Sequence, residues 1–303
     1  KGDGDSYRAA VKNLRSEGVE RIVSPHASLR TAFFARAIGA RRKISFRTWW
    51  NGFVFTERVN RDLRLPDALR QMSLLRRDDG NLDENLEQYI KSGRAYRMEE
   101  HQLSGVPPWA KMSLRARLLE DTEAWVSLMG RIGWTKYEGL SKVLIFPGSV
   151  WATKRWTEKG YVELAKGLQK KNAQIIVMGA GNEVEIAERV AGQIPGAVSL
   201  AGVTSLYESA LLLCHSDLMV GNDSASIHLA SACETPLVAI FGPTILEFGF
   251  RPWSDQAYIM ERKGLACRPC GPHGHHKCPK GTHECMKNLS AQEVLRVAES
   301  LLP

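Results

Sequence analysis

The chain has 303 residues, of which 44% are hydrophobic, and a formal net charge of +8. This length predicts a globular protein with two domains of ordinary size. No apolar run reaches the roughly 20 residues that cross a bilayer, and no signal peptide is present. The sequence therefore predicts a soluble or peripheral protein rather than one that spans a membrane.

The positive charge favours an anionic partner, which could be a nucleotide, a nucleic acid or an anionic lipid surface. No recognised nucleic-acid-binding motif is present, so a nucleic-acid binder ranks last. Much of the charge lies before residue 136, although scattered arginines also suit a solvated surface. The basic residues in that region include Arg41, Arg42, Lys43, Arg58, Arg61, Arg64, Arg70, Arg76, Arg77, Arg115 and Arg117.

Six cysteines are present, and four of them are clustered. At this length they do not resemble the disulfide framework of a secreted protein, which favours a cytoplasmic location. The first residue is Lys1 rather than Met, so the chain is consistent with a piece of a longer one.

The first part of the chain shows an incomplete alternation of strands and helices. The expected elements are an amphipathic helix over 6–18, a strand over 20–24, a helix over 28–38 and a strand over 43–46. Further on come a basic and aromatic stretch over 47–79, a polar irregular stretch over 80–110 and a helix over 114–132.

From residue 143 onward the alternation becomes regular, which predicts a parallel α/β domain. The expected strands cover 143–146, 173–178, 198–200, 218–220 and 237–241. The expected helices cover 157–170, with Thr157 as N-cap, and 183–193, 205–214 and 227–233. A boundary between Gly133 and Ser141 divides the chain into domains over 1–137 and 138–303.

The segment from Gly221 to Thr244 is the most informative part of the chain. A buried strand ends in a polar turn that contains Asp223, Ser224 and Ala225, and a helix follows. The amide groups at such a helix N-terminus suit a phosphate, and ligands of open parallel sheets bind at the carboxyl ends of strands. His228 follows Asp223 by one helical turn and could reach the same ligand. The alternative is a connector with a solvated aspartate and a core-facing histidine.

The loop over 147–156 also follows a predicted strand. Ser149 and Thr153 offer hydroxyl groups and Lys154 offers a compact positive charge, which together suit a departing phosphate. The spacing is not that of a Walker loop, and the alternative is a surface loop with an exposed lysine. Trp151 and Trp156 are more typical of packing.

Two further candidates follow predicted strands. Glu183 lies just beyond the glycine turn Gly179–Gly181 and could bind ribose hydroxyls, or it could be an acidic residue at a helix N-terminus. His26 and Arg30 follow the strand over 20–24 and could face a cleft between domains or cap a helix.

The cysteine group is made up of Cys267, Cys270, Cys278 and Cys285, with four histidines between them. These cysteines could close a tetrahedral zinc site, but the second pair lacks CxxC spacing. Reduced structural thiols or a disulfide are the alternatives.

Three segments in this order resemble the ADP-heptose:lipopolysaccharide heptosyltransferases, inverting enzymes of glycosyltransferase family 9. They are PGSVWATKRWTEKGYVELAKGL, AGVTSLYESALLLCHSDLMVGNDSASIHLASACETPLVAIFGPT and CRPCGPHGHHKCPKGTHECMKNLSAQEV. The resemblance is strong over 143–298 and weaker over 8–50.

The resemblance implies a GT-B architecture, with two Rossmann-like domains whose parallel sheets face each other across a cleft. In this architecture the last helix of the chain can pack back against the N-terminal domain. On this basis Lys154 and Asp223 are the candidate catalytic residues, and Arg30 faces an anionic lipid A–Kdo acceptor. The residues expected to contact the nucleotide sugar are Ser149, Thr153, Lys154, Glu183, Asp223, Ser224, Ala225 and His228.

The resemblance implies transfer of heptose from ADP-heptose to the inner core of lipopolysaccharide, with inversion and without a required cofactor. The expected protein is a monomer at the cytoplasmic face of the inner membrane, without nucleic acid as a partner. The alternatives are an inactive or truncated nucleotide-sugar-binding module and a GT-B enzyme that uses another nucleotide sugar.

Two departures from the family pattern stand out. Ala225 occupies a position that is usually glycine, where a positive φ would strain it. The family also opens with a strand and a Gly-Asp loop whose aspartate is the candidate general base, whereas this chain begins several elements later. Asp3 and Asp5 follow glycines, but no strand precedes them.

Overall fold

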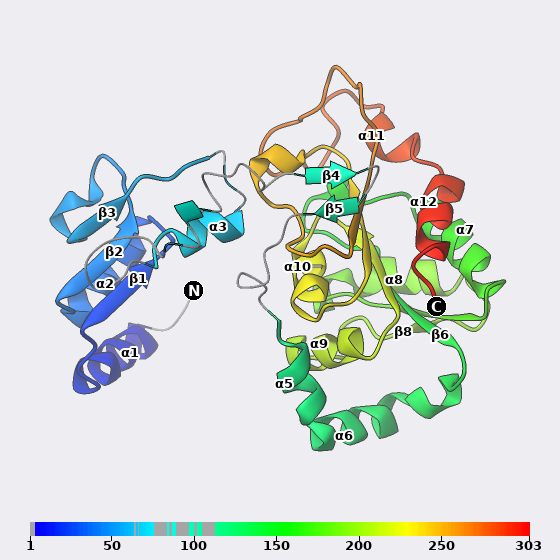
Figure 1. The fold of residues 1–303 in the computed structure, drawn as a ribbon, viewed down its shortest axis with the longest axis horizontal. Helices are drawn as coiled ribbons and strands as arrows, with labels where there is room; N and C mark the ends of the chain where they lie inside the picture. The colour runs from blue at the N-terminus through cyan, green and yellow to red at the C-terminus, as the bar shows by residue number, and fades with distance from the viewer. Residues whose placement is uncertain are drawn as a thin grey trace. The chain divides into compact units, whose positions relative to one another are not determined.

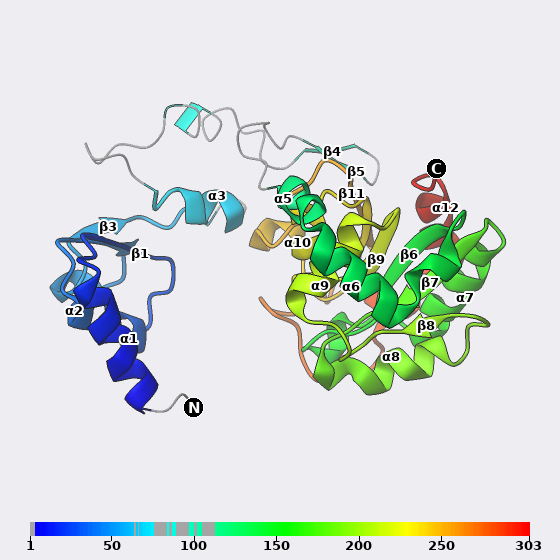
Figure 2. The same cartoon turned by 90° about the horizontal axis from the view of Figure 1, so that it is seen from below.

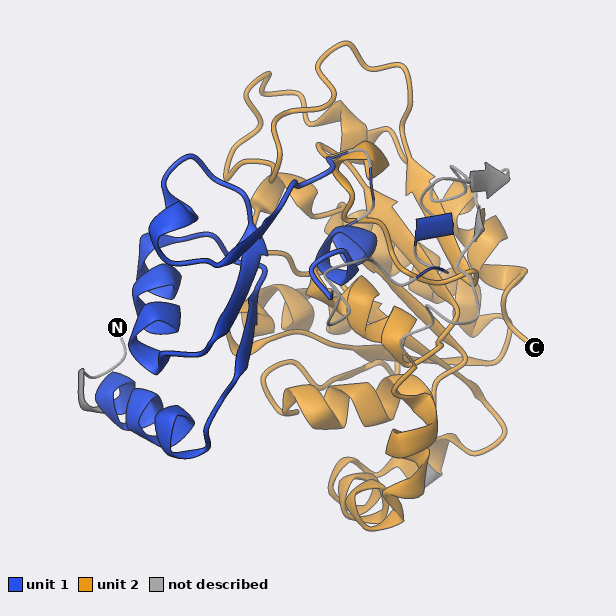
Figure 3. Cartoon of the chain, turned by 60° about the vertical axis from the view of Figure 1, so that its left-hand side comes forward, with its two compact units in different colours: residues 1–95 blue, residues 96–303 orange. Residues whose placement is uncertain are grey.

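A computed structural model of the chain describes residues 4–63, 65, 67–75, 84, 87–88, 97–99, 102–104 and 113–303. The chain forms two compact units, Lys1–Ala95 and Tyr96–Pro303, and each is described by itself (Figure 3). No helix in the described ranges combines the length and the apolar character that a membrane crossing requires.

The first unit contains a three-stranded parallel sheet in the order β1-β2-β3. Its elements are α1 (Gly4–Ser16), β1 (Arg21–Ser24), α2 (Leu29–Ile38), β2 (Arg42–Phe46), β3 (Glu57–Val59) and α3 (Asp67–Met72). The Ser28 side chain caps α2 by accepting a hydrogen bond from the Thr31 amide, and Gly39 ends the helix at φ 81°. Alanines of α2 pack on Val54 and Phe55 in a small core.

The second unit contains an eight-stranded sheet in the order β4-β5-β11-β10-β9-β6-β7-β8 (Figure 1). The six strands from β11 to β8 pair in parallel, whereas β5 pairs antiparallel with β11 and with β4. The strands are β4 (Arg97–Glu99), β5 (Gln102–Ser104), β6 (Ser141–Phe146), β7 (Ala173–Val177), β8 (Val198–Ser199), β9 (Leu218–Asn222), β10 (Leu237–Phe241) and β11 (Ala257–Glu261).

Helices cover both faces of this sheet, so its central strands are continuous apolar runs (Figure 2). Along β6, Val143 and Ile145 pack with α7, α8 and α12, whereas Leu144 and Phe146 pack with α5, α6, α9 and α10. The helices are α5 (Arg115–Glu120), α6 (Thr122–Ile132), α7 (Glu158–Gln169), α8 (Val184–Ala191), α9 (Leu206–Cys214), α10 (Ala225–Ala232), α11 (Glu284–Lys287) and α12 (Ala291–Glu299).

The elements expected from residue 143 onward are confirmed, with small shifts at their ends. Thr157 caps α7 as predicted, since its hydroxyl accepts a hydrogen bond from the Gly160 amide at 3.0 Å. The helix expected over 114–132 is interrupted, because the Asp121 carboxylate caps a new helix at the Ala124 amide. The strands β3, β4, β5 and β11 were not predicted.

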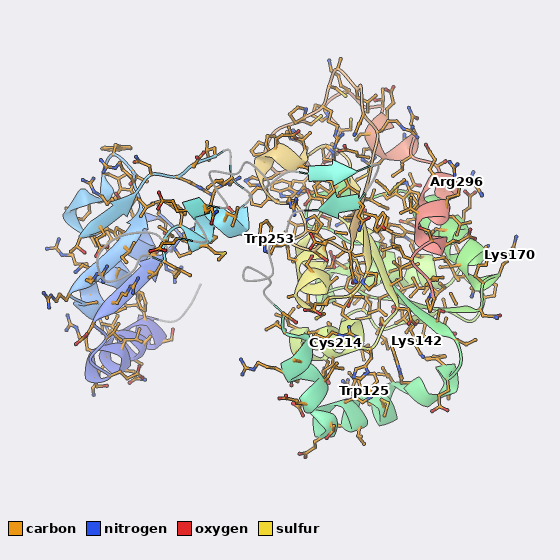
Figure 4. All side chains as sticks on the ribbon, in the orientation of Figure 1. Trp125, Lys142, Lys170, Cys214, Trp253 and Arg296 are labelled. Atoms are coloured by element: carbon orange, nitrogen blue, oxygen red, sulfur yellow. The ribbon has the colours of Figure 1, made fainter. Side chains whose placement is uncertain are left out.

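The compact second unit begins at Tyr96, upstream of the boundary expected near residue 137. The physical reason is that α5 and α6 pack on α9 of this unit, where the ring of Trp125 stacks on that of His215 at 3.7 Å (Figure 4). The last helix, α12, packs against α7 within the same unit.

Candidate functional site

The carboxyl ends of the parallel strands bring three polar side chains together. Lys154 follows β6, Asp223 follows β9 and Thr244 follows β10, and parallel pairing places these three ends at one edge of the sheet. The Lys154 ammonium and the Thr244 hydroxyl both donate to Oδ2 of Asp223, each at 2.6 Å. This edge is where open α/β sheets bind ligands.

The Lys154–Asp223 pair is almost completely withdrawn from solvent. Lys154 is 8% exposed and Asp223 is 4% exposed. Charges are buried at this level only when they are paired and hydrogen-bonded, and the pair meets that condition. The ammonium is therefore held in a low-dielectric setting, where its attraction for an incoming anion is stronger than it would be in water.

Asn222 fixes the loop that carries Lys154. Its side-chain amide donates to the carbonyl oxygens of Pro147 and Gly148 at 2.9 and 3.0 Å. Its side-chain oxygen accepts from the Trp156 amide at 2.8 Å and from the Tyr161 hydroxyl at 2.9 Å. Sequence reasoning missed this role, although a polar residue at the end of a buried strand was the available signal.

Glu183 lies against the same loop. Its carboxylate accepts a hydrogen bond from the Ala180 amide at 3.0 Å. A Cβ atom at Gly148 would lie 2.3 Å from the carboxyl carbon of Glu183, so a side chain at this position would displace the Glu183 carboxylate. Burial raises the pKa of the Tyr161 phenol well above its usual range, and the nearby charge of Glu183 acts in the same direction.

The N-terminus of α10 begins beside Asp223. Ser224 is the N-cap residue, and its hydroxyl pairs with that of Ser226 at 2.8 Å rather than capping the helix. The first amides of a helix lack intrahelical partners and favour an anion. Ala225 lies in the first turn of α10 and is not among the positive-φ residues of the described chain, so its Cβ causes no strain.

The remaining predicted residues of the second unit differ in how far they are exposed to solvent. Ser149 is buried in the 147–156 loop, and its carbonyl accepts from Nε of Arg155 at 2.9 Å. His228 is exposed on α10, so the alternative of a core-facing histidine is wrong. Thr153 is buried, and its hydroxyl is engaged by His275, accepting from its amide at 2.7 Å and donating to its carbonyl at 2.8 Å.

In the first unit, Arg30 is exposed in the first turn of α2, just beyond the carboxyl end of β1. Helix α2 is capped by Ser28, and His26 contacts the Thr31 hydroxyl at 3.1 Å. Among the predicted basic residues, Arg70 is buried and donates to the Leu65 carbonyl at 2.6 Å. Arg64, Arg76 and Arg77 lie outside the described residues.

The four cysteines of the cysteine group were also considered as a zinc site. Among the described residues, which include all four cysteines, no three His, Cys, Asp or Glu side chains are arranged to hold a metal ion. The thiols have other partners, since Cys270 donates to the Cys267 carbonyl at 2.8 Å and Cys278 accepts from the His283 amide at 3.4 Å. All six cysteines are free thiols.

Comparison with known proteins gives concordant matches. Lipopolysaccharide heptosyltransferase 2 of Salmonella typhimurium is 32% identical over 160 residues, which is 49% of this chain and 43% of that protein. Lipooligosaccharide heptosyltransferase 2 of Campylobacter jejuni is 30% identical over 162 residues, or 52% of this chain and 49% of that protein. The chain therefore spans about half the length of the curated relatives it matches.

Solved structures show the same α/β fold with parallel sheets. E. coli ADP-heptose LPS heptosyltransferase II matches with a TM-score of 0.71 and 20% identity, over 97% of this chain and 80% of that one. E. coli heptosyltransferase WaaC with ADP matches with a TM-score of 0.65 and 16% identity, over 98% and 77%. The expected GT-B fold class is confirmed.

The family model of glycosyltransferase family 9 (heptosyltransferase) matches residues 7–279, and the chain belongs to this family.

Proposed function

We propose that the chain is an inverting heptosyltransferase that moves heptose from ADP-heptose to the inner core of lipopolysaccharide. The observation that carries the proposal is the buried Lys154 ammonium, held by Asp223 at the carboxyl edge of the sheet beside the start of α10. An ammonium and free helix amides in one place suit a diphosphate that gains charge as it leaves.

The proposed reaction is a single displacement. A hydroxyl oxygen of the acceptor attacks the anomeric carbon of the heptose, and the bond from that carbon to the phosphate oxygen breaks. The electron pair leaves with ADP, whose diphosphate is stabilised by Lys154 and the amides of α10. Lys154 thus supplies positive charge that a metal ion would otherwise provide.

The proton of the attacking hydroxyl passes to a carboxylate within hydrogen-bond reach. Neither aspartate considered for this role is described at the level of its side chain. Asp3 lies outside the described residues, and the backbone of Asp5 lies in the first turn of α1.

Glu183 is proposed to bind the ribose of the nucleotide, and Asp223, Ser224, Ala225 and His228 are proposed to line the sugar and phosphate. Ser149 lies in the same loop as Lys154 and is proposed to contact the diphosphate. For Thr153, the two hydrogen bonds with His275 favour an indirect role over contact with the donor.

On the acceptor side, the carboxyl edge of the first unit is basic and aromatic. Arg30 follows β1, Arg47 and the 95%-exposed Trp49 follow β2, and Arg61 follows β3. Guanidinium groups suit carboxylates and phosphates, and an exposed indole suits a sugar face. We propose that this edge binds an anionic acceptor of the lipid A–Kdo type. We further propose that the protein acts as a monomer at the cytoplasmic surface of the inner membrane.

The second candidate is a nucleotide-sugar-binding module without transfer activity, since the buried Lys154 ammonium and the amides of α10 suit donor binding without transfer equally well. The two are separated by incubating the chain with ADP-heptose and a heptose-deficient lipopolysaccharide acceptor and following release of ADP. Acceptor-dependent ADP release with a heptosylated product supports the enzyme. Donor binding without product supports the module.

A further inference from the structure

The segment over 267–285, here called the strap, leads from β11 towards α11 and is the orange loop before that helix in Figure 1. It lies against two of the three loops that carry the Lys154–Asp223–Thr244 group, those after β6 and β10. The Cys270 amide donates to the Pro243 carbonyl at 2.8 Å, and the Arg268 guanidinium donates to the Thr244 carbonyl at 2.7 Å. The strap is thus fastened to the loop after β10.

The strap also holds the loop after β6. The Thr153 amide donates to the His275 carbonyl at 3.0 Å, and the Thr153 hydroxyl exchanges two more hydrogen bonds with the backbone of His275. Gly274 makes this approach possible, because its φ is +78° and a Cβ there would lie 3.0 Å from the Thr153 hydroxyl and 3.3 Å from Cγ of Lys154. These contacts lie one residue from the Lys154 backbone.

The side chain of His283, also in the strap, makes a further contact with the loop after β6. Nε2 of His283 lies 2.8 Å from the Thr153 carbonyl, and because a carbonyl can only accept, the imidazole donates. His283 adopts a left-handed backbone at φ 54°, and its amide donates to the Cys278 sulfur. The amide, carbonyl and hydroxyl of Thr153 are therefore all hydrogen-bonded to the strap.

The backbone next to His283 is held in place by the buried residues of the helix that follows it. Cys285 and Met286, in the helix that follows, are buried. A Cβ at Gly242 would lie 2.6 Å from Cε of Met286, so this helix packs directly on the turn after β10. The Trp156 indole donates to the Leu289 carbonyl at 3.0 Å just beyond the helix. His283 thus connects a fixed part of the domain to the loop that carries Lys154.

We propose that His283 is a positioning residue that holds the Thr153–Lys154 turn in place for the donor diphosphate. The inference rests on the proposed function, in which Lys154 contacts the diphosphate. Without the imidazole, the Thr153 carbonyl loses its donor, and the hydrogen bonds between Thr153 and the strap are reduced to those with His275. Lys154 then spends less time in its binding position, and the affinity for ADP falls.

The variants His283→Ala, His283→Asn and His283→Gln separate this role from a backbone role. Asparagine tolerates the left-handed backbone well but places its amide nitrogen too near the main chain, whereas glutamine carries a nitrogen at the reach of Nε2. We expect Ala and Asn to weaken ADP binding about tenfold and Gln to stay within about threefold of the parent. His273→Ala, a strap histidine whose ring lies 6.3 Å from that of Phe250, is the matched control and should bind ADP as the parent does.

Calorimetric titration with ADP measures the affinity, and hydrogen exchange of the peptide over 149–156 measures the loop directly. Faster exchange at Thr153 in the Ala and Asn variants, but not in Gln or His273→Ala, supports the inference. Parental exchange and ADP affinity in His283→Ala would overturn it, as would full affinity in His283→Asn. If the parent itself does not bind ADP, the proposed function fails, while the exchange data still decide whether His283 holds the loop.

Discussion

Lys154 and Asp223 come from loops 69 residues apart in the chain, and their side chains meet at 2.6 Å in a part of the domain where both residues are buried. The pairing holds the Lys154 ammonium at the edge of the sheet while keeping it buried. A diphosphate that enters this edge competes with the Asp223 carboxylate for the ammonium.

Replacing Lys154 should separate activity from stability. Lys154→Ala should lower turnover about 100-fold or more, because it removes a donor to the leaving group. It should also destabilise the fold by about 3 kcal/mol, because Asp223 is left buried with Thr244 as its remaining donor. In the double variant Lys154→Met with Asp223→Asn, stability should recover while turnover stays low. Recovery of turnover in the double variant would contradict the assigned role.

Gly148 should not accept a side chain. Gly148→Ala places a methyl group 2.3 Å from the Glu183 carboxyl carbon, which should cost about 1–3 kcal/mol in the free energy of unfolding or displace Glu183. Gly181→Ala is the matched control, since its Cβ would meet no atom within 4 Å. Urea denaturation measures both, and adding Glu183→Ala to Gly148→Ala should recover much of the loss. Equal stability of the two alanine variants would show that the close approach is not maintained.

Asn222 should be essential to the loop that carries Lys154. Asn222→Ala leaves the Trp156 amide and two carbonyl groups without their partner, which should cost about 2–4 kcal/mol. Asn222→Asp keeps the acceptor but loses both amide donors, so it should recover little of that stability. Thermal unfolding of the purified variants gives the comparison, and a parental melting temperature in Asn222→Ala would refute the expectation.

The hydroxyl of Thr153 gives a conservative pair of variants. Thr153→Ser keeps both hydrogen bonds to His275, whereas Thr153→Val keeps the shape and loses them. We expect the serine variant to bind ADP within about twofold of the parent and the valine variant to bind about tenfold more weakly. If the hydroxyl instead contacts the donor directly, the two variants will differ in ADP affinity while exchange at the His275 amide stays unchanged.

The junction of α12 with the sheet should confer acid sensitivity. Hydrogen bonds from the Ser290 side chain and backbone, followed by the Arg262 guanidinium, lower the pKa of Glu293 to about 2. A folded-state pKa below the unfolded value gives stabilisation that is present above about pH 5 and is lost as the pH falls toward 2. Because the Glu293 side chain is one third exposed, this amounts to about 1 kcal/mol. Glu293→Gln should lower the melting temperature at pH 7, and the difference from the parent should shrink below about pH 4 and disappear near pH 2.

Much of the second unit follows from the sequence because its signals are local. The apolar runs of β6, β9 and β10 and the Thr157 cap are readable within a few residues, and parallel pairing then places the loops after these strands at one edge. That reasoning placed the Lys154 loop and the Asp223 turn each at the carboxyl end of a strand, and the resemblance to the family then assigned both residues to one site.

The parts that were missed depend on contacts between distant segments. The hydrogen bonds between Thr153 and His275 join residues that lie 122 positions apart in the chain, and nothing in either local sequence indicates them. The small strands β4 and β5 exist through pairing with each other and with β11, not through a strong pattern of their own. Asn222 ends the buried strand β9, which signals a polar role there, but the partners of its four hydrogen bonds are known only after the sheet is assembled.

The Lys154 edge of the second unit should bind a nucleoside diphosphate. Calorimetric titration of ADP into the parent and into the Lys154→Met, Asp223→Asn double variant measures this binding. We expect saturable binding to the parent and affinity at least about tenfold lower in the double variant, with both proteins folded. Equal affinity in the two proteins, or no binding of ADP to the parent, would contradict it.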